Sequence, residues 1–188
     1  MAKTSTSQRG QSGWAAVRKK LDAFDRASLL GLVHDLYDAT TSNRRFLEAR
    51  LLSSSTTVEE YRRLVADAVY PDPLGRRHIS LRDATATIAE FRRSTGDLSG
   101  TLDLMLTFIE AGTDQAADLG YGDDSYFSAL ERKLDAVAKS WPDLPPDARA
   151  QAGKRLDLVR DRAQHIGWGY GDYVADIVGT LRTSNGRK

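Results

Sequence analysis

The sequence predicts an all-α fold, a single domain of about nine helices arranged as stacked antiparallel helix pairs, as in helical-repeat proteins. In the long segments between turn signals, apolar residues recur every three or four positions, which is the spacing of one helix face. Strictly alternating β-branched runs, which indicate strands, are missing from the sequence. The most apolar run, Thr101–Gly112, carries large apolar residues around most of a helix, so we expect a buried central helix there.

Helix start and stop signals predict five helices before this central one. Side-chain oxygens of Ser, Thr and Asp bond free amides at a helix start, whereas Pro and Gly end helices. Gly31, inside the second helix, is expected to mark a close helix–helix approach. The expected boundaries are a first helix over Ser12–Ala23, a second from Asp25 or Arg26, a third capped by Ser42 and reaching Leu52, a fourth opened by a Thr57–Glu60 capping box and stopped by Pro71, and a fifth from Ser80 to Gly96.

The second half of the chain predicts the central helix and three more. Asp97 is expected to open the central helix, which continues to Ala117 or Leu119. Three helices are expected after it: one capped by Asp123 or Asp124, one with Pro146 in its first turn, and one capped by Asp172. The tetrapeptide Gly-Tyr-Gly-Asp occurs at 120–123 and again at 169–172. We interpret this recurrence as turn-and-cap chemistry used twice.

Length and composition favour one helical domain over 12–182, with disordered polar tails at 1–11 and 183–188. Cysteine is absent, which excludes disulfides and thiolate metal sites and is typical of a cytoplasmic protein. No apolar run approaches the roughly 20 residues of a membrane-spanning helix, so no membrane association is expected.

Charge is distributed unevenly along the chain, although the net charge is only +1. Residues 1–96 sum to +5 and residues 97–188 to −4, and the segment 97–135 alone carries −7. A loop in that segment combines carboxylates with tyrosines, which offer rigid apolar area at small entropic cost. We predict a partner surface formed by Asp118, Tyr121, Asp123, Asp124 and Tyr126. Its complement is a basic partner or the arginine-rich half of a second copy, so self-association is an alternative.

Paired arginines predict an alternative nucleic-acid surface, because guanidinium groups fit phosphate oxygens. The candidate contacts are Arg44, Arg45, Arg62, Arg63, Arg92 and Arg93. The competing interpretation is solvated helix faces with intrahelical ion pairs, such as Glu48 with Arg44 or Arg45. Residues 44–93 contain ten basic and seven acidic residues, and this small positive excess favours the second interpretation.

Residues with catalytic or metal-binding potential are few. His34 and Asp38 share a helix face, but only three histidines occur and no second ligand pair accompanies them. Glu110, in the most apolar helix, is a candidate acid or base, although an ion pair with Arg92 or Arg93 explains it better. The Gly-rich run 167–171 lacks a dinucleotide-binding spacing and a preceding strand. No catalytic residue, cofactor or metal site is therefore predicted.

Four segments together resemble a bacterial all-helical family catalogued as a domain of unknown function. They are LLGLVHDLYDATTSNRRFLEAR (29–50), YRRLVADAVYP (61–71), IAEFRRSTGDLSGTLDLMLTFIEAGT (88–113) and IGWGYGDY (166–173). The resemblance rests on their order and spacing over most of residues 14–181. It implies an all-helical fold and adds no activity.

These observations predict a non-enzymatic helical protein-interaction module that binds a protein partner. A nucleic-acid-binding accessory protein that uses the paired arginines is the alternative. A hydrolase or metal-dependent enzyme built around Glu110 or His34 comes third, because no nucleophile or second carboxylate pair accompanies either residue.

Overall fold

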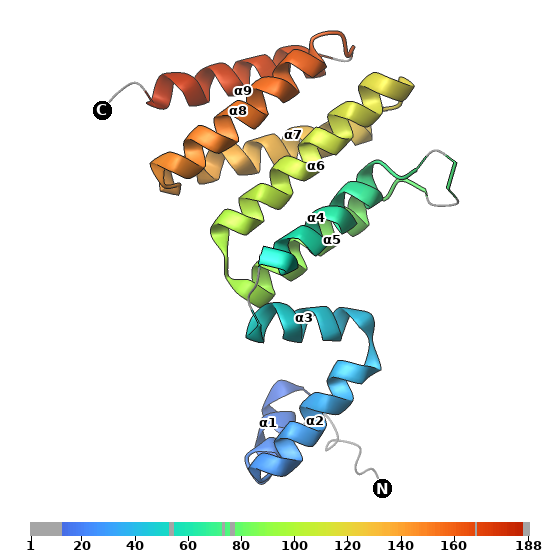
Figure 1. The fold of residues 1–188 in the computed structure, drawn as a ribbon, viewed down its shortest axis with the longest axis vertical. Coiled ribbons are helices and arrows are strands. Elements are labelled where there is room, and N and C mark those ends of the chain that lie inside the picture. The colour runs from blue at the N-terminus through green and yellow to red at the C-terminus, as the bar shows by residue number, and fades with distance from the viewer. Residues whose placement is uncertain (1–12, 53–54, 73, 76–77, 168, 186–188) are drawn as a thin grey trace, which may run out of the picture. The chain divides into compact units, whose positions relative to one another are not determined.

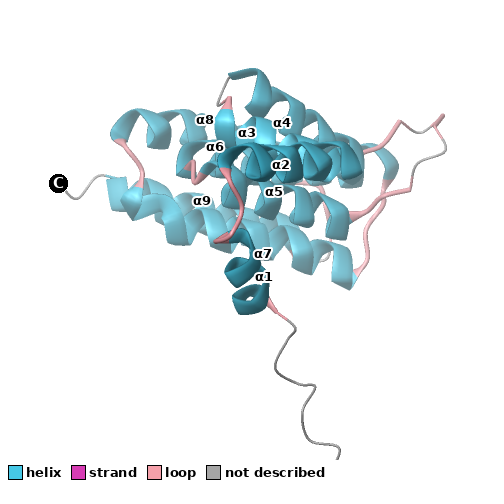
Figure 2. Ribbon diagram, turned by 90° about the horizontal axis from the view of Figure 1, so that it is seen from below, coloured by secondary structure: helices cyan, strands magenta, loops and turns pink. Residues whose placement is uncertain are grey.

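The computed structural model describes residues 13–52, 55–72, 74–75, 78–167 and 169–185. Within these residues the chain forms nine α-helices, one short 3-10 helix and no strand, which confirms the all-α prediction (Figures 1 and 2). The chain divides into two compact units, 1–47 and 48–188, and the division falls inside the third helix.

The first unit contains α1 (Trp14–Leu21), α2 (Arg26–Ala39) and the start of α3 (Thr41–Leu51). The Asp25 side chain caps α2 by accepting a hydrogen bond from the Ser28 amide at 2.7 Å, as expected of one of its two candidate starts. Neither α1 nor α2 contains a buried residue. The close approach expected at Gly31 is wrong, because a Cβ at that position would have open space around it.

The second unit contains α4 (Ser55–Val69), α5 (Leu81–Thr95), α6 (Leu98–Leu119), α7 (Asp124–Ser140), a 3-10 helix η1 (Trp141–Asp143), α8 (Pro146–Ala163) and α9 (Tyr170–Asn185). The central helix is α6, which packs against α4, α5, α7 and α8. The helix pairs α4–α5, α7–α9 and α8–α9 also pack together, and Figure 1 shows α6 crossing the middle of this unit. The packed helix pairs expected from the sequence are therefore present.

Helix α6 is buried on most of its circumference, as the run 101–112 predicts. The Asp97 side chain caps it by accepting a hydrogen bond from the Gly100 amide at 3.0 Å, and Gly120 ends it in the left-handed conformation with φ 61°. Gly112 lies against α7 so closely that a Cβ there would sit 2.3 Å from Leu130 Cδ2. This glycine therefore permits the tight α6–α7 packing.

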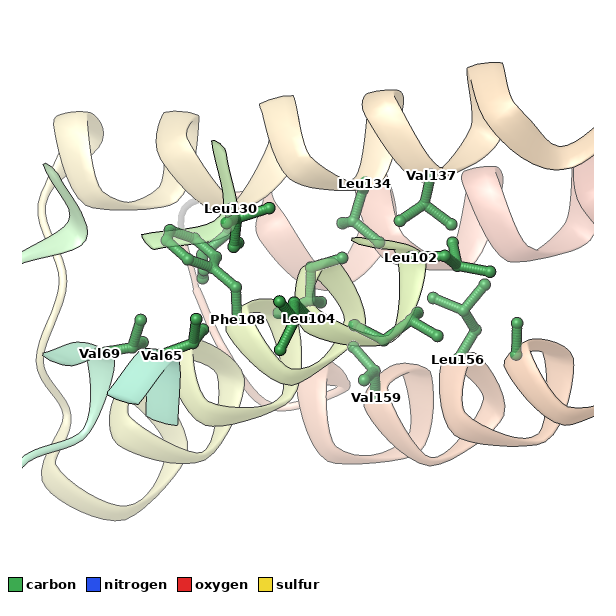
Figure 3. Close-up of a cluster of buried hydrophobic side chains, with 14 of the residues drawn as sticks. Val65, Val69, Leu102, Leu104, Phe108, Leu130, Leu134, Val137, Leu156 and Val159 are labelled. Carbon is green, nitrogen blue, oxygen red and sulfur yellow. The ribbon is translucent and has the colours of Figure 1, made fainter. Parts of the chain in front are cut away.

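The core of the second unit is apolar and comes from every helix between α4 and α9. Figure 3 shows part of it, with side chains of α6 meeting those of α4, α7 and α8. The labelled side chains are Val65, Val69, Leu102, Leu104, Phe108, Leu130, Leu134, Val137, Leu156 and Val159, each at most 6% exposed. Burial of this kind is the main source of stability in a helical unit.

Most of the helix boundaries expected around α5 to α8 are confirmed. Each follows local chemistry, namely a side-chain oxygen that accepts an amide, a glycine in the left-handed region, or a proline in the first turn. The confirmed signals are Ser80, Gly96, Asp97, Asp123 and Pro146.

Two expected caps before mid-chain are wrong. The third helix is capped by Thr40, whose Oγ1 accepts the Asn43 amide at 3.0 Å, and not by Ser42, which lies within it. The fourth helix already includes Ser55, so Thr57 lies inside its first turn and the capping box does not open it. In both places, several hydroxyl residues stand in a row, and the helix continues further toward the N-terminus than the expected cap.

The two Gly-Tyr-Gly-Asp segments adopt different structures. In the first, Asp123 caps α7; in the second, the helix already begins at Tyr170, so the expected cap at Asp172 is wrong. Gly171 lies against the end of α8, where a Cβ would sit 2.6 Å from the Ala163 carbonyl oxygen. The last helix also continues to Asn185, so residues 183–185 are helical instead of part of a tail. The tails expected at 1–11 and 186–188 lie outside the described residues.

Candidate functional site

Three of the five residues of the expected acidic partner surface, Asp118, Asp123 and Tyr126, make hydrogen bonds or ion pairs within the second unit. Asp123 Oδ1 accepts hydrogen bonds from the Tyr126 amide and the Ser125 hydroxyl, both at 2.8 Å. The Ser125 hydroxyl and the Tyr126 amide together lower the pKa of Asp123. This carboxylate therefore caps the N-terminus of α7.

Tyr126 is only 3% exposed, and its hydroxyl donates a hydrogen bond to the Gly112 carbonyl at 2.9 Å. Asp118 accepts from the Tyr70 hydroxyl at 3.0 Å and forms an ion pair with Arg162. Of the five predicted residues, this leaves Tyr121, which is 50% exposed, and the exposed Asp124. Asp118 and Asp123 are exposed as well, and the Tyr121 ring packs edge-on against Tyr126 with 5.4 Å between the ring centroids, so the acidic partner surface stays a prediction.

Carboxylates of α6 instead line a polar seam between this helix and its neighbours α4 and α8. The seam residues recur at three- or four-residue intervals, so they share one helix face. They are Asp103, Thr107, Glu110, Asp114 and Asp118. We call them, with their basic partners Arg62, Arg155 and Arg162, the ion-pair seam.

Arg155 of α8 is the centre of the ion-pair seam. Its Nε and Nη2 donate to both oxygens of Glu110 at 2.6 and 2.5 Å, and its Nη1 donates to Asp103 Oδ1 at 2.6 Å. Burial alone would lower the pKa of Arg155, but hydrogen bonds and charges from Glu110 and Asp103 raise it. The expectation that Glu110 pairs with Arg92 or Arg93 is wrong, because Arg155, 45 residues further along the chain, occupies both of its oxygens.

The two ends of the seam are closed by further arginines. Arg62 of α4 donates through Nε and Nη2 to Asp103 Oδ2, at 3.1 and 2.8 Å, so two guanidinium groups hold this carboxylate. At the other end, Arg162 pairs with Asp114 at 3.3 Å and with Asp118. Burial raises the pKa of Asp114, and the contacts with Arg162 oppose that shift. This pattern of compensated charges supports a structural role for the seam.

The predicted nucleic-acid contacts are dispersed. Arg44 lies over the Tyr37 ring at 5.0 Å and 3.7 Å from Asp38, within the first unit. Arg45 also lies on α3 in the first unit, and Arg62 belongs to the ion-pair seam. The remaining three, Arg63, Arg92 and Arg93, are exposed on α4 and α5.

The histidine and carboxylate with metal-binding potential, His34 and Asp38, both lie on α2. His34 Nδ1 lies 3.5 Å from Asp38 on the exposed face of α2. The part of the chain that the structure describes contains no cluster of three or more His, Asp or Glu ligands. Across the same residues, no helix has the length and apolar character needed to cross a membrane.

Two open pockets flank Tyr121. One, of about 390 Å³, is lined by both glycine-rich turns together with Arg162 and His165. The other, of about 310 Å³, includes His78 and Gln115. Their described lining residues provide no carboxylate pair and no nucleophile bonded to a base.

Tyr170 of the second glycine-rich turn is fully buried, and its hydroxyl lies 2.8 Å from Thr113 Oγ1. Trp168, the other aromatic residue of that turn, lies outside the described residues.

The most unusual surface of the molecule belongs to the first unit. We call its large apolar side chains on α1, α2 and their connection the exposed apolar set. It comprises Trp14 (70% exposed), Val17 (49%), Phe24 (44%), Leu29 (37%), Leu30 (58%), Val33 (40%) and Leu36 (49%). Scattered apolar residues are normal on a surface, but seven within 23 residues on two helices without a buried residue are not.

Sequence reasoning missed the exposed apolar set because periodicity identifies an apolar face without saying what covers it. The available signal was length: helices of 8 and 14 residues, joined by four residues, have little area to pack against each other.

Comparisons with known proteins find no matching family model, no matching curated protein and no matching solved structure. The family resemblance drawn from the sequence therefore stays a prediction.

Proposed function

We propose that the protein is a non-enzymatic interaction module that binds a protein partner through the exposed apolar set. The observation that carries this proposal is the absence of any buried residue in α1 and α2, although both helices carry large apolar side chains. Contiguous exposed apolar area on a protein surface is typical of a binding site.

Physical chemistry supports a partner for these helices. Isolated helices of fewer than about 12–15 residues are marginal in water, and packing of an apolar face supplies most helix stability in proteins. Covering a large apolar side chain is worth about 25 cal/mol per Å² of area removed from water. A partner that covers Trp14, Leu30 and their neighbours therefore stabilises α1 and α2 while it binds.

The second unit supports the proposed interaction function in a different way. It has an apolar core, and its half-buried carboxylates Asp103 and Glu110 are paired with arginines of the same unit. These are the properties of a stable scaffold. The second unit also exposes large apolar side chains, among them Leu74, Leu98 and Leu158, but its helices α5 to α8 contribute buried residues to a core, whereas α1 and α2 contribute none.

Site-specific photocrosslinking in the native cells tests the proposal. A photoreactive amino acid at Leu30 should give a discrete protein adduct, with either a second copy or another protein. The matched control is the same amino acid at Leu158, a leucine of α8 that is 70% exposed and lies outside the exposed apolar set. If Leu30 gives no adduct, or if Leu158 gives the same adducts as Leu30, the exposed apolar set is not a binding surface.

A further inference from the structure

The identity of the partner follows from how charge is distributed over the exposed helices, an inference that rests on the proposed function. Helix α1 contains Arg18, Lys19 and Lys20 and no acidic residue, so it carries +3. The following segment, 22–39, contains four aspartates and one arginine, so it carries −3. The two halves are equal and opposite in charge.

The apolar side chains of the two helices also match. Trp14, Val17 and Leu21 on α1 follow an i, i+3, i+7 spacing. Leu29, Val33 and Leu36 on α2 follow an i, i+4, i+7 spacing. Each pattern gives one apolar stripe of the kind that packs against another helix. Within one chain these stripes do not cover each other, because their large side chains remain 37–70% exposed apart from Leu21.

We propose that the partner is a second copy of this chain, and that α1 of each copy packs on α2 of the other. The apolar stripes meet in such a pair, and the basic residues beside the α1 stripe face Asp35 and Asp38 of the other copy. A two-fold axis repeats every contact, so one complementary surface is used twice in a closed dimer.

Charge also argues against the main competing occupant, an anionic membrane. Basic amphipathic helices bind such surfaces because their net positive charge is attracted to the lipid headgroups. Over residues 13–39 the net charge is zero, so α2 and its connection cancel the attraction that α1 provides. The same cancellation is what a self-complementary protein contact requires.

Light scattering after gel filtration of the full chain is the first test. The expected mass is twice the 20.7 kDa of one chain at micromolar concentration. The pair Val33→Glu and Leu36→Glu should yield the monomer mass, because two charges would enter the apolar contact. Leu158→Glu, at a 70% exposed leucine of α8, should leave the dimer intact.

Charge reversal tests the reciprocal arrangement. One variant carries Arg18→Glu, Lys19→Glu and Lys20→Glu, and the other carries Asp35→Lys and Asp38→Lys. Each alone should dimerise about tenfold more weakly or worse, since several surface pairs change from attractive to repulsive. Mixing the two should restore association as a heterodimer, because each reversed helix then faces its complement. Although Arg44 lies 3.7 Å from Asp38, the Asp38 side chain is 56% exposed, so it remains accessible to a second copy.

Three results would overturn the proposal: a monomer across the concentration range, a dimer that survives Val33→Glu with Leu36→Glu, or a mixture of the reversed variants that does not associate. Co-sedimentation of the wild type with phosphatidylserine vesicles as a monomer would also overturn it, in favour of a membrane surface. A monomer that still gives a foreign-protein adduct from Leu30 would remove the second copy and leave the proposed function standing.

Discussion

Replacing Arg155 by methionine should destabilise the second unit by about 2–3 kcal/mol. This guanidinium makes three short hydrogen bonds to Glu110 and Asp103, and charge-assisted bonds are each worth about 1.5–3 kcal/mol when buried. The total contribution of the three bonds must be reduced, because the side chains of Arg155, Glu110 and Asp103 are 26%, 32% and 24% exposed and water screens their charges. In the variant, Asp103 also retains its ion pair with Arg62. Most of the loss therefore comes from Glu110, which is left beside other carboxylates without this cation.

Urea unfolding monitored by circular dichroism measures the effect, and a loss of about 2–3 kcal/mol corresponds to a fall in Tm of about 5–10 °C. Adding Glu110→Gln to Arg155→Met should recover about 1–2 kcal/mol, because the amide removes the uncompensated charge. Arg63→Met, at an exposed arginine of α4, is the matched control and should change stability by less than about 0.5 kcal/mol. A loss below about 0.5 kcal/mol for Arg155→Met would refute a stabilising role for the ion-pair seam.

Three further predictions follow from the core, the tyrosines and the arginines. Leu106→Ala should cost about 2–5 kcal/mol in urea unfolding, since this α6 side chain is 2% exposed; a loss under about 1 kcal/mol would contradict its place in the core. Burial raises the pKa of Tyr126 and Tyr170, so folding is favoured by these groups below their ordinary pKa near 10 and loses that support as pH rises above it. Ultraviolet titration should therefore show at least two of the seven tyrosines ionising only as the chain unfolds; reversible ionisation of all seven in the folded protein near pH 10 would contradict this. Duplex and single-stranded DNA should not shift in a mobility assay at low salt, and a shift abolished by Arg92→Ala with Arg93→Ala would revive the nucleic-acid alternative.

The fold could be predicted from the sequence where the determining chemistry is local. The caps at Ser80 and Asp97 and the stop at Gly96 depend on contacts within four residues, and a sequence displays these directly. The central helix was equally visible, because an apolar run on most sides has no stable place except the interior.

The site could not be predicted where the contact is distant in the chain. Glu110 is paired with Arg155 instead of a nearer arginine, and only the packing of α8 on α6 decides this. Tyr126 is an acceptable surface residue by type, yet it is buried and its hydroxyl donates to the Gly112 carbonyl of α6. Periodicity on α1 and α2 was correctly assigned to helices, but an apolar stripe has the same spacing whether it is covered by the same chain or by another.

The position of α6 in the chain has a consequence for synthesis on the ribosome. The helix that α4, α5, α7 and α8 all share begins only at residue 98, so the preceding half of the chain emerges before its packing surface exists. At about 5–20 residues per second, α7 and α8 need several more seconds to follow. During that interval α4 and α5 can pair with each other but expose the faces that α6 later covers. Nascent chains halted before and after residue 119 should therefore differ sharply in their resistance to proteases and in their capture by chaperones.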